Sequence, residues 1–164
     1  MKKIPVSIYS LIILLLVIVT GCDVINKDIQ QSDIQQLTDN LKVNYELIEV
    51  KTNCGCLNDK SLDKCYLFQL SLTMPMAFNK QGWEIYFSQK NLIIKAESHN
   101  FAIEKINGEL HRLYPKEQFK GFEQEKIIRI LLTAKAVQLK DALLLPNFYV
   151  MSKGLKATVI KNSR

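Results

Sequence analysis

The sequence predicts an all-β domain built as a sandwich of antiparallel strands. Apolar and polar residues alternate along short segments, most clearly over 41–47 and 66–72, and this period of two is typical of strands with one buried face. Turn-forming pairs separate the segments, among them Asn107-Gly108, Lys120-Gly121 and Pro146-Asn147. No long helical period interrupts the strands, which favours a β-sandwich over a mixed fold.

Residues 1–21 have the composition of a cleavable export signal. Lys2 and Lys3 precede an apolar run, residues 4–19, which suits a signal and is marginal for a membrane-spanning helix. The run closes with Val19-Thr20-Gly21-Cys22, which resembles a bacterial lipobox, whose cysteine receives a diacylglycerol. We therefore expect cleavage before Cys22, lipid on Cys22 and a place in the bacterial cell envelope, facing the periplasm or the exterior. An uncleaved anchor is the alternative, and the choice between inner and outer membrane stays open.

The segment 22–40 is polar and rich in Gln and Asp, as expected of a lipidated tether. Ile25 and Ile29 are four residues apart, and Ile34 and Leu37 are three apart, which permits a short amphipathic helix. A flexible leader is the alternative at this length and polarity.

The sandwich domain is expected over residues 41–160, with 161–164 as a short tail. A chain of 164 residues, less its signal, is long enough for one such domain with a core of its own. The expected strands are 41–47, 66–72, 83–88, 92–97, 101–106, 110–114, 126–133, 148–151 and 157–160.

The charge pattern argues against nucleic acid as a partner. The formal net charge of +6 includes Lys2 and Lys3 of the export signal. The other basic residues are spread along the chain instead of forming a run, so an ordinary solvated surface accounts for them.

Three further cysteines, Cys54, Cys56 and Cys65, lie between the first two expected strands. In an oxidising compartment this odd number leaves one thiol over. Cys54 and Cys56 are too close to pair comfortably with each other, so we expect Cys65 to pair with one of them and favour Cys56. A metal site is disfavoured, because the two histidines lie far along the chain and the spacing of zinc ligands is missing.

Five ordered motifs in the domain resemble those of one known family. They are Gly82–Gln89 (GWEIYFSQ), Phe101, Ile106–Pro115 (INGELHRLYP), Phe119–Phe122 (FKGF) and Leu145–Val150 (LPNFYV). In this order and spacing they resemble the N-terminal domain of bacterial chitobiases and β-hexosaminidases of glycoside hydrolase family 20, over about residues 41–160. The cysteines before the second strand are also similar to the disulfide loop of chitobiase.

The resemblance implies an immunoglobulin-like β-sandwich similar to cellulose-binding modules, classed as carbohydrate-binding. In the family it precedes a catalytic barrel, which takes about 250 residues and carries the acid/base Glu and its Asp partner. We therefore expect this chain to need no cofactor, to be no enzyme, and to bind N-acetylglucosamine-containing glycans of the chitin or peptidoglycan type. The alternative is a fragment or remnant of a β-N-acetylhexosaminidase that lacks the barrel.

Sugar-binding sandwiches expose planar rings that stack on sugar faces, with polar side chains beside them for the hydroxyls. Trp83 shares a strand face with Ile85 and Phe87, so we favour the core for Trp83 and the exposed face for Tyr86. The candidate rings and polar partners are Trp83, Tyr86, Tyr114, Phe148, Tyr149, Gln89, Asn107 and Asn147.

Other positions have a structural interpretation or depart from the family. Phe119 and Phe122 are expected to plug one end of the sandwich, and Asn107-Gly108 is expected to form a turn. Family members often carry Trp near Val137-Gln138 and usually at position 148, and neither site is Trp here. This loss of ring surface weakens the inference of sugar binding.

Overall fold

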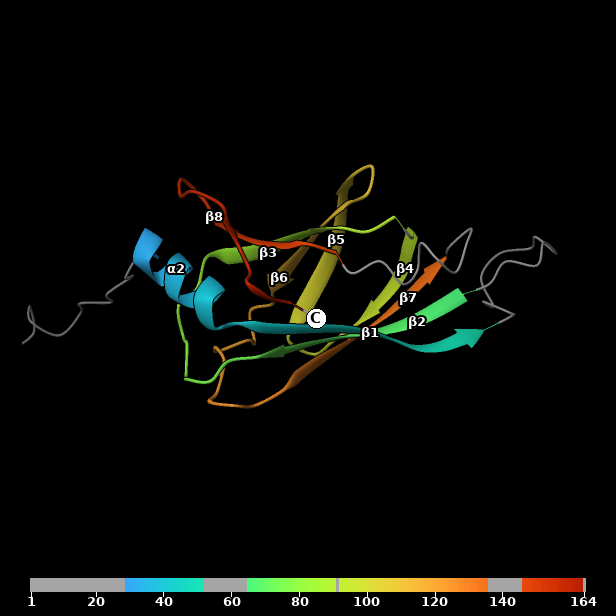
Figure 1. Cartoon of the computed structure of the whole chain (residues 1–164), viewed down its shortest axis with the longest axis horizontal. Helices are drawn as coiled ribbons and strands as arrows, with labels where there is room; N and C mark the ends of the chain where they lie inside the picture. Colours follow the sequence, from blue (N-terminus) through green and yellow to red (C-terminus); the bar gives the residue numbers. More distant parts are fainter. Residues whose placement is uncertain (1–28, 52–64, 91, 136–145, 164) are drawn as a thin grey trace, which may run out of the picture.

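Two five-stranded sheets pack face to face in the computed structural model, which describes residues 29–51, 65–90, 92–135 and 146–163 (Figure 1). One helix, α2 (Gln31–Asn40), precedes the strands in this part of the chain. The strands are β1 (Lys42–Lys51), β2 (Cys65–Thr73), β3 (Trp83–Ser88), β4 (Leu92–Glu97), β5 (Phe101–Asn107), β6 (Leu110–Pro115), β7 (Ile128–Lys135), β8 (Phe148–Ser152), β9 (Thr158–Val159) and β10 (Asn162–Ser163). The prediction of an all-β sandwich is confirmed.

The first sheet has the strand order β10-β1-β2-β7-β4, and the second has the order β5-β6-β3-β8-β9. All neighbours are antiparallel except β10, which runs parallel to β1. Gly108 and Glu109 form the turn that joins β5 to β6, and Gly108 has the positive φ of +53° that such a tight hairpin uses. The predicted turn is present, but Asn107 is the last residue of β5 and the turn begins at Gly108.

The core lies between the sheets because each strand turns its alternate residues inward. Along β2 the predicted inward residues Tyr66, Phe68, Leu70 and Leu72 are all buried. Opposite them, β3 buries Trp83, Ile85 and Phe87. The alternation of the sequence therefore identifies the buried face of both strands.

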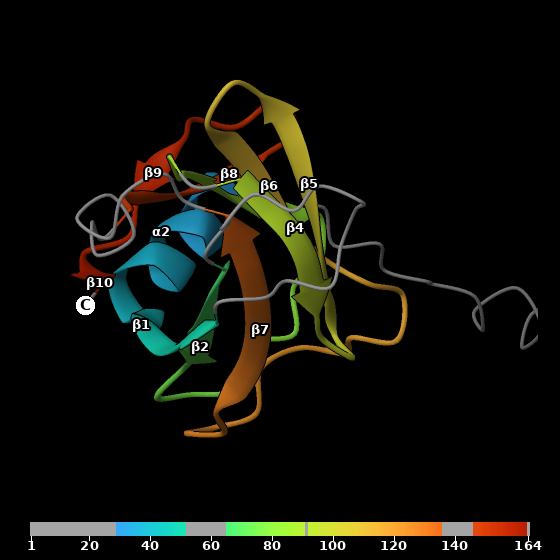
Figure 2. The same cartoon turned by 90° about the vertical axis from the view of Figure 1, so that its right-hand side faces the viewer.

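Helix α2 closes one side of the sandwich, where it contacts β8 and β9 (Figure 2). A capping box starts it: the Asp33 carboxylate accepts a hydrogen bond of 2.9 Å from the backbone N–H of Gln30. Ile34 and Leu37 are fully buried and belong to the core. The helical alternative is thus correct for residues 31–40. This half of the segment expected to be a tether packs in the core, because its apolar pair meets the open side of the two sheets.

Aromatic rings fill one end of the interior. Trp83, Phe101, Phe119 and Phe122 have ring centroids 4.8 to 6.4 Å apart. The expectation that the two loop phenylalanines plug this end is confirmed. Gly121, between them, has a φ of +126°, and an added Cβ would lie 2.5 Å from the Phe78 carbonyl oxygen, so a side chain has no room there.

Several predictions concern residues outside the described ranges. These are lipidation of Cys22, the cysteines Cys54 and Cys56, and the family departure at Val137-Gln138. Cys65 is the first residue of β2 and is buried. Among the described residues no helix is long and apolar enough to cross a membrane.

Candidate functional site

The outer surface of the second sheet gathers three tyrosines, and we call it the tyrosine face. On β3, β6 and β8 the inward residues are apolar or aromatic apart from His111, and the outward residues include three tyrosines and two charged side chains. The tyrosine face consists of Glu84, Tyr86, Glu104, Arg112, Tyr114 and Tyr149, with Met151 and Val159 at its β8–β9 side.

Strand register places these side chains in rows across the sheet. Arg112 and Tyr149 are the two cross-strand neighbours of Tyr86, on β6 and β8. The same row continues to Glu104 on β5 and to Val159 on β9. Side chains directly opposite in a ladder have Cβ atoms about 4.5–5.5 Å apart, so Tyr86 and Tyr149 project from neighbouring points of the sheet.

A charged network holds one half of the tyrosine face in place. Arg112 donates from Nη1 to Oε1 of Glu84 at 3.1 Å and from Nη2 to Oε2 of Glu104 at 2.5 Å. Its guanidinium lies 4.8 Å from the ring centroid of Tyr114. The Tyr86 hydroxyl donates to Oε2 of Glu84 at 2.8 Å. Each member of this network is oriented by at least one other, so the polar groups are fixed before any ligand arrives.

The three rings differ in exposure. Tyr149 is 39% exposed, while Tyr86 and Tyr114 are half-buried. Desolvation and, after it, the neighbouring Glu84 carboxylate raise the pKa of Tyr86, so this hydroxyl is a neutral donor at physiological pH. Beside Tyr149, Met151 and Val159 are exposed and apolar. The surface therefore pairs a ring and apolar side chains with fixed carboxylates and a guanidinium, a combination that can stack on sugar rings and hydrogen-bond their hydroxyls.

The structure separates the predicted sugar-binding residues into two groups. Tyr86, Tyr114 and Tyr149 come together on one face, and Asn147, just before β8, is exposed. Trp83 and Phe148 are each 1% exposed and point into the core, since both lie on inward positions of their strands. Neither ring has a free face for a sugar, which agrees with the core assignment favoured for Trp83 and corrects the assignment of Phe148.

The polar candidates also differ. Gln89 is 2% exposed, and its side-chain amide donates to the Tyr45 hydroxyl at 2.9 Å inside the sandwich, so it is not available to a surface ligand. Asn107 is exposed at the β5–β6 turn, away from the tyrosine row. Sequence reasoning missed Glu84, Glu104 and Arg112. Their outward positions follow from strand alternation, but their convergence depends on the register between strands.

Within the described parts of the chain, no three His, Cys, Asp or Glu side chains cluster closely enough to hold a metal ion. The two carboxylates of the tyrosine face are both engaged by Arg112.

Comparisons with known proteins identify the family to which this domain is similar. Residues 40–164 match a family model described as "Putative carbohydrate binding domain". A β-hexosaminidase of Vibrio vulnificus is 30% identical over 138 residues, which are 83% of this chain and 16% of that protein. An N,N'-diacetylchitobiase of Vibrio harveyi is 26% identical and is matched over 85% of this chain and 16% of its own length. The chain thus spans about a sixth of the length of these two relatives.

A solved structure supports the fold. The crystal structure of an exo β-N-acetylglucosaminidase from Vibrio harveyi, in complex with N-acetylglucosamine, superposes with a TM-score of 0.50 at 10% identity. The match covers 77% of this chain and 18% of that one. At this identity the similarity extends to the fold alone.

Proposed function

This chain belongs to the carbohydrate-binding domain family found in β-hexosaminidases and chitobiases, and on that premise we propose that it is a non-catalytic module that binds glycans on its tyrosine face. The observation that carries the proposal is the convergence of Tyr86, Tyr114 and Tyr149 on one exposed sheet surface. Planar rings on such a surface match the apolar faces of pyranose rings.

The role of each side chain of the tyrosine face in binding follows from its exposure to solvent. Tyr149 is the most exposed ring and would provide the main stacking surface, extended by Met151 and Val159. Tyr86, its neighbour in the row, would stack on the adjoining sugar and offer its hydroxyl. Glu84 and Arg112, already oriented, would hydrogen-bond hydroxyl and acetamido groups at the edge of the ligand.

The proposal also names the class of glycan that the module binds. We propose glycans that contain N-acetylglucosamine, of the chitin or peptidoglycan type, because the matched relatives are named for enzymes of β-linked hexosamines. The N-terminal lipobox resemblance adds a proposed location: lipid on Cys22 would hold the module to a membrane of the bacterial envelope. We also propose that the chain lacks hydrolase activity, since the matched family model is that of a binding domain.

The test is calorimetric titration of the full chain with chitooligosaccharides. Tyr149→Ala should reduce affinity about tenfold to a hundredfold, equivalent to roughly 1–3 kcal/mol for a stacking ring. Tyr149→Phe, which keeps the ring, should retain most of the binding. Ile48→Ala is the matched control, because Ile48 is 50% exposed on the other sheet. An absence of binding at millimolar ligand would contradict the proposal and leave the alternative, a remnant domain of a β-N-acetylhexosaminidase with a packing role.

A further inference from the structure

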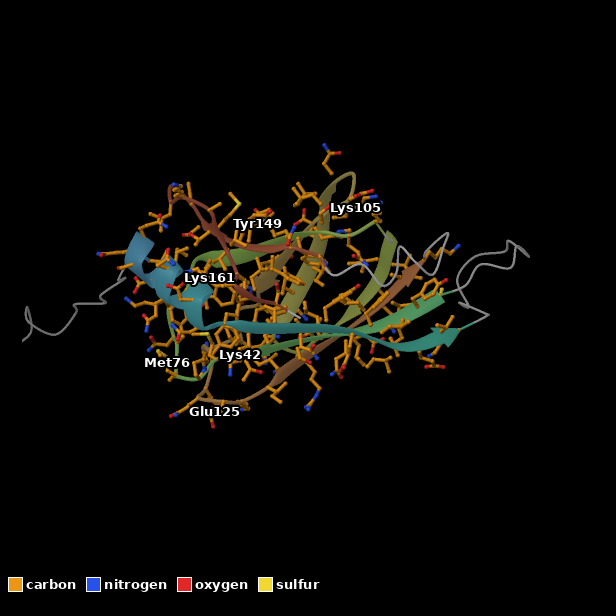
Figure 3. The ribbon with its side chains drawn as sticks, in the orientation of Figure 1. Lys42, Met76, Lys105, Glu125, Tyr149 and Lys161 are labelled. Carbon is orange, nitrogen blue, oxygen red and sulfur yellow. The ribbon has the colours of Figure 1, made fainter. Side chains whose placement is uncertain are left out.

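A polar groove lies on the outer face of the first sheet, on the opposite side of the sandwich from the tyrosine face. Figure 3 shows Lys42 on this side and Tyr149 on the other. The groove has a volume of about 650 Å³, within the range of small-ligand sites. It runs over β1, β2, β7 and the segment around β10, and its polar lining residues are Lys42, Asn44, Glu46, Gln69, Ser71, Thr73, Arg129, Lys161 and Ser163.

Neutral polar side chains of β2 and the adjoining part of β1 lie in the middle of this groove, which we call its floor, between charged residues. Asn44, Ser71 and Arg129 make one row across β1, β2 and β7, with Ser71 in the middle and nearly buried. In the next row the amide of Gln69 donates to Oε1 of Glu46 at 2.9 Å and to Ser71 Oγ at 3.1 Å. Neighbouring strands lie about 4.8 Å apart, so the hydroxyl and amide groups of this floor stand close enough together to bond several groups of one ligand.

The charges around the floor are mainly positive. Lys42, Arg129 and Lys161 face a single lining carboxylate, Glu46, which is already bonded to Gln69. Lys161 is also paired with Asp39 outside the groove, at 2.6 Å. Lys42 and Arg129 make no ion pair with another residue in the described ranges, so they supply the positive potential of the groove.

We propose that this groove is a second binding site, which takes a segment of an acidic oligosaccharide whose sugars bear carboxylates. Arg129 would bind a carboxylate with its planar guanidinium and Lys42 would bind another as a point charge. The hydroxyls of the same sugars would hydrogen-bond the floor at Asn44, Ser71 and Thr73. The proposal commits to a saccharide and not to another polyanion because Asn44, Ser71 and Thr73, which lie between the cations, offer neutral hydroxyl and amide groups. It stands independently of sugar binding at the tyrosine face.

The test uses the full chain and an oligouronate of six residues, with chitohexaose as the neutral saccharide of equal length and oligoglutamate as the non-sugar anion. We expect the oligouronate to bind more tightly than both, and to shift backbone amide resonances over 42–46, 69–73 and 127–129. The double variant Lys42→Gln/Arg129→Gln should weaken this binding at least tenfold. Raising the salt concentration should weaken it as well, as for any charge-assisted contact.

The matched control is Lys105→Gln/Lys153→Gln, which removes the same charge from exposed sites outside the groove. Equal losses in the two double variants would overturn the proposal, because net charge alone would then explain the binding. Oligoglutamate binding as tightly as the oligouronate would overturn the saccharide part. Amide shifts confined to β3, β6 and β8 would place the acidic sugar on the tyrosine face instead. A Tyr149→Ala variant should leave oligouronate binding unchanged.

Discussion

The Tyr86 hydroxyl donates a hydrogen bond of 2.8 Å to the Glu84 carboxylate, two residues earlier on the same outward face of β3. Burial is the larger cause of the raised pKa of Tyr86, and the carboxylate adds to it because a phenolate beside it would be repelled. The Glu84 carboxylate also accepts a hydrogen bond from Arg112, and the positive charge of Arg112 lowers the pKa of Tyr86. The ionisation of Tyr86 therefore reports on the order of the whole network.

We predict opposite shifts in the pKa of Tyr86 when its two neighbours are changed. Glu84→Gln should lower the pKa, because it removes the negative charge that opposes the phenolate. Arg112→Met should raise it further, since the compensating cation is lost. A pH titration of the Tyr86 ring ¹³Cζ resonance in the full chain measures both shifts. Unchanged values in both variants would show that the network is not formed in solution.

The sequence could predict most strands because their pattern is local. The segments 83–88 and 92–97 have the bounds of β3 and β4 as observed. The pairing of β10 with β1 was missed, and its residues were assigned to a tail, because a strand of two residues cannot show alternation. The sequence permits both a helix and a flexible leader here, because the segment is short and polar.

The candidate site was predictable only residue by residue. Alternation along β3 shows that Tyr86 is outward and Trp83 inward, and the same reasoning on β8 separates Tyr149 from Phe148. Nothing local shows that Tyr149 lies beside Tyr86, because that register joins strands from distant parts of the chain. The groove could not be predicted for the same reason, because its rows combine residues of β1, β2 and β7. Register is set by packing of the whole core.

A second prediction concerns the disulfide expected between Cys56 and Cys65. Closing a loop of about ten residues should contribute roughly 2.5–3 kcal/mol by the chain-entropy model, enough to move the melting temperature by several degrees. Reduction and Cys56→Ser should lower the melting temperature by similar amounts, and Cys54→Ser should change it little. Peptide mapping of unreduced material would identify the bond. A larger loss for Cys54→Ser than for Cys56→Ser would assign Cys54 as the partner instead.

A third prediction concerns lipidation of Cys22. Cys22→Ser should abolish incorporation of labelled palmitate and leave the precursor unprocessed, because the serine hydroxyl does not accept the diacylglycerol. Gel mobility and partitioning into detergent report on both steps. Cys54→Ser is a suitable control, since it removes a thiol without touching the lipobox. Normal processing and partitioning of the Cys22 variant would contradict the lipoprotein proposal.

The last prediction is a loss of stability in mild acid caused by His111. This side chain is 2% exposed on β6, stacks on Phe87 with ring centroids 5.5 Å apart, and lies opposite Lys105 on β5. Its Nδ1–H donates to the carbonyl of Glu109 at 2.9 Å, while its Nε2 is buried with no partner among the described residues. A second proton would therefore have no acceptor.

Burial, with a smaller contribution from the charge of Lys105, holds the pKa of His111 below its ordinary value of 6.5. The unfolded chain then binds the proton more readily than the folded one, so stability is fully present above about pH 6.5 and falls as the pH is lowered towards the folded-state pKa. One such group makes the free energy of unfolding change by at most about 1.4 kcal/mol per pH unit.

Urea denaturation between pH 7.5 and pH 5 measures this slope. His111→Phe should remove most of the slope in this window, and His99→Phe, at an exposed histidine, should not. A slope that survives in His111→Phe would assign the acid sensitivity to another group.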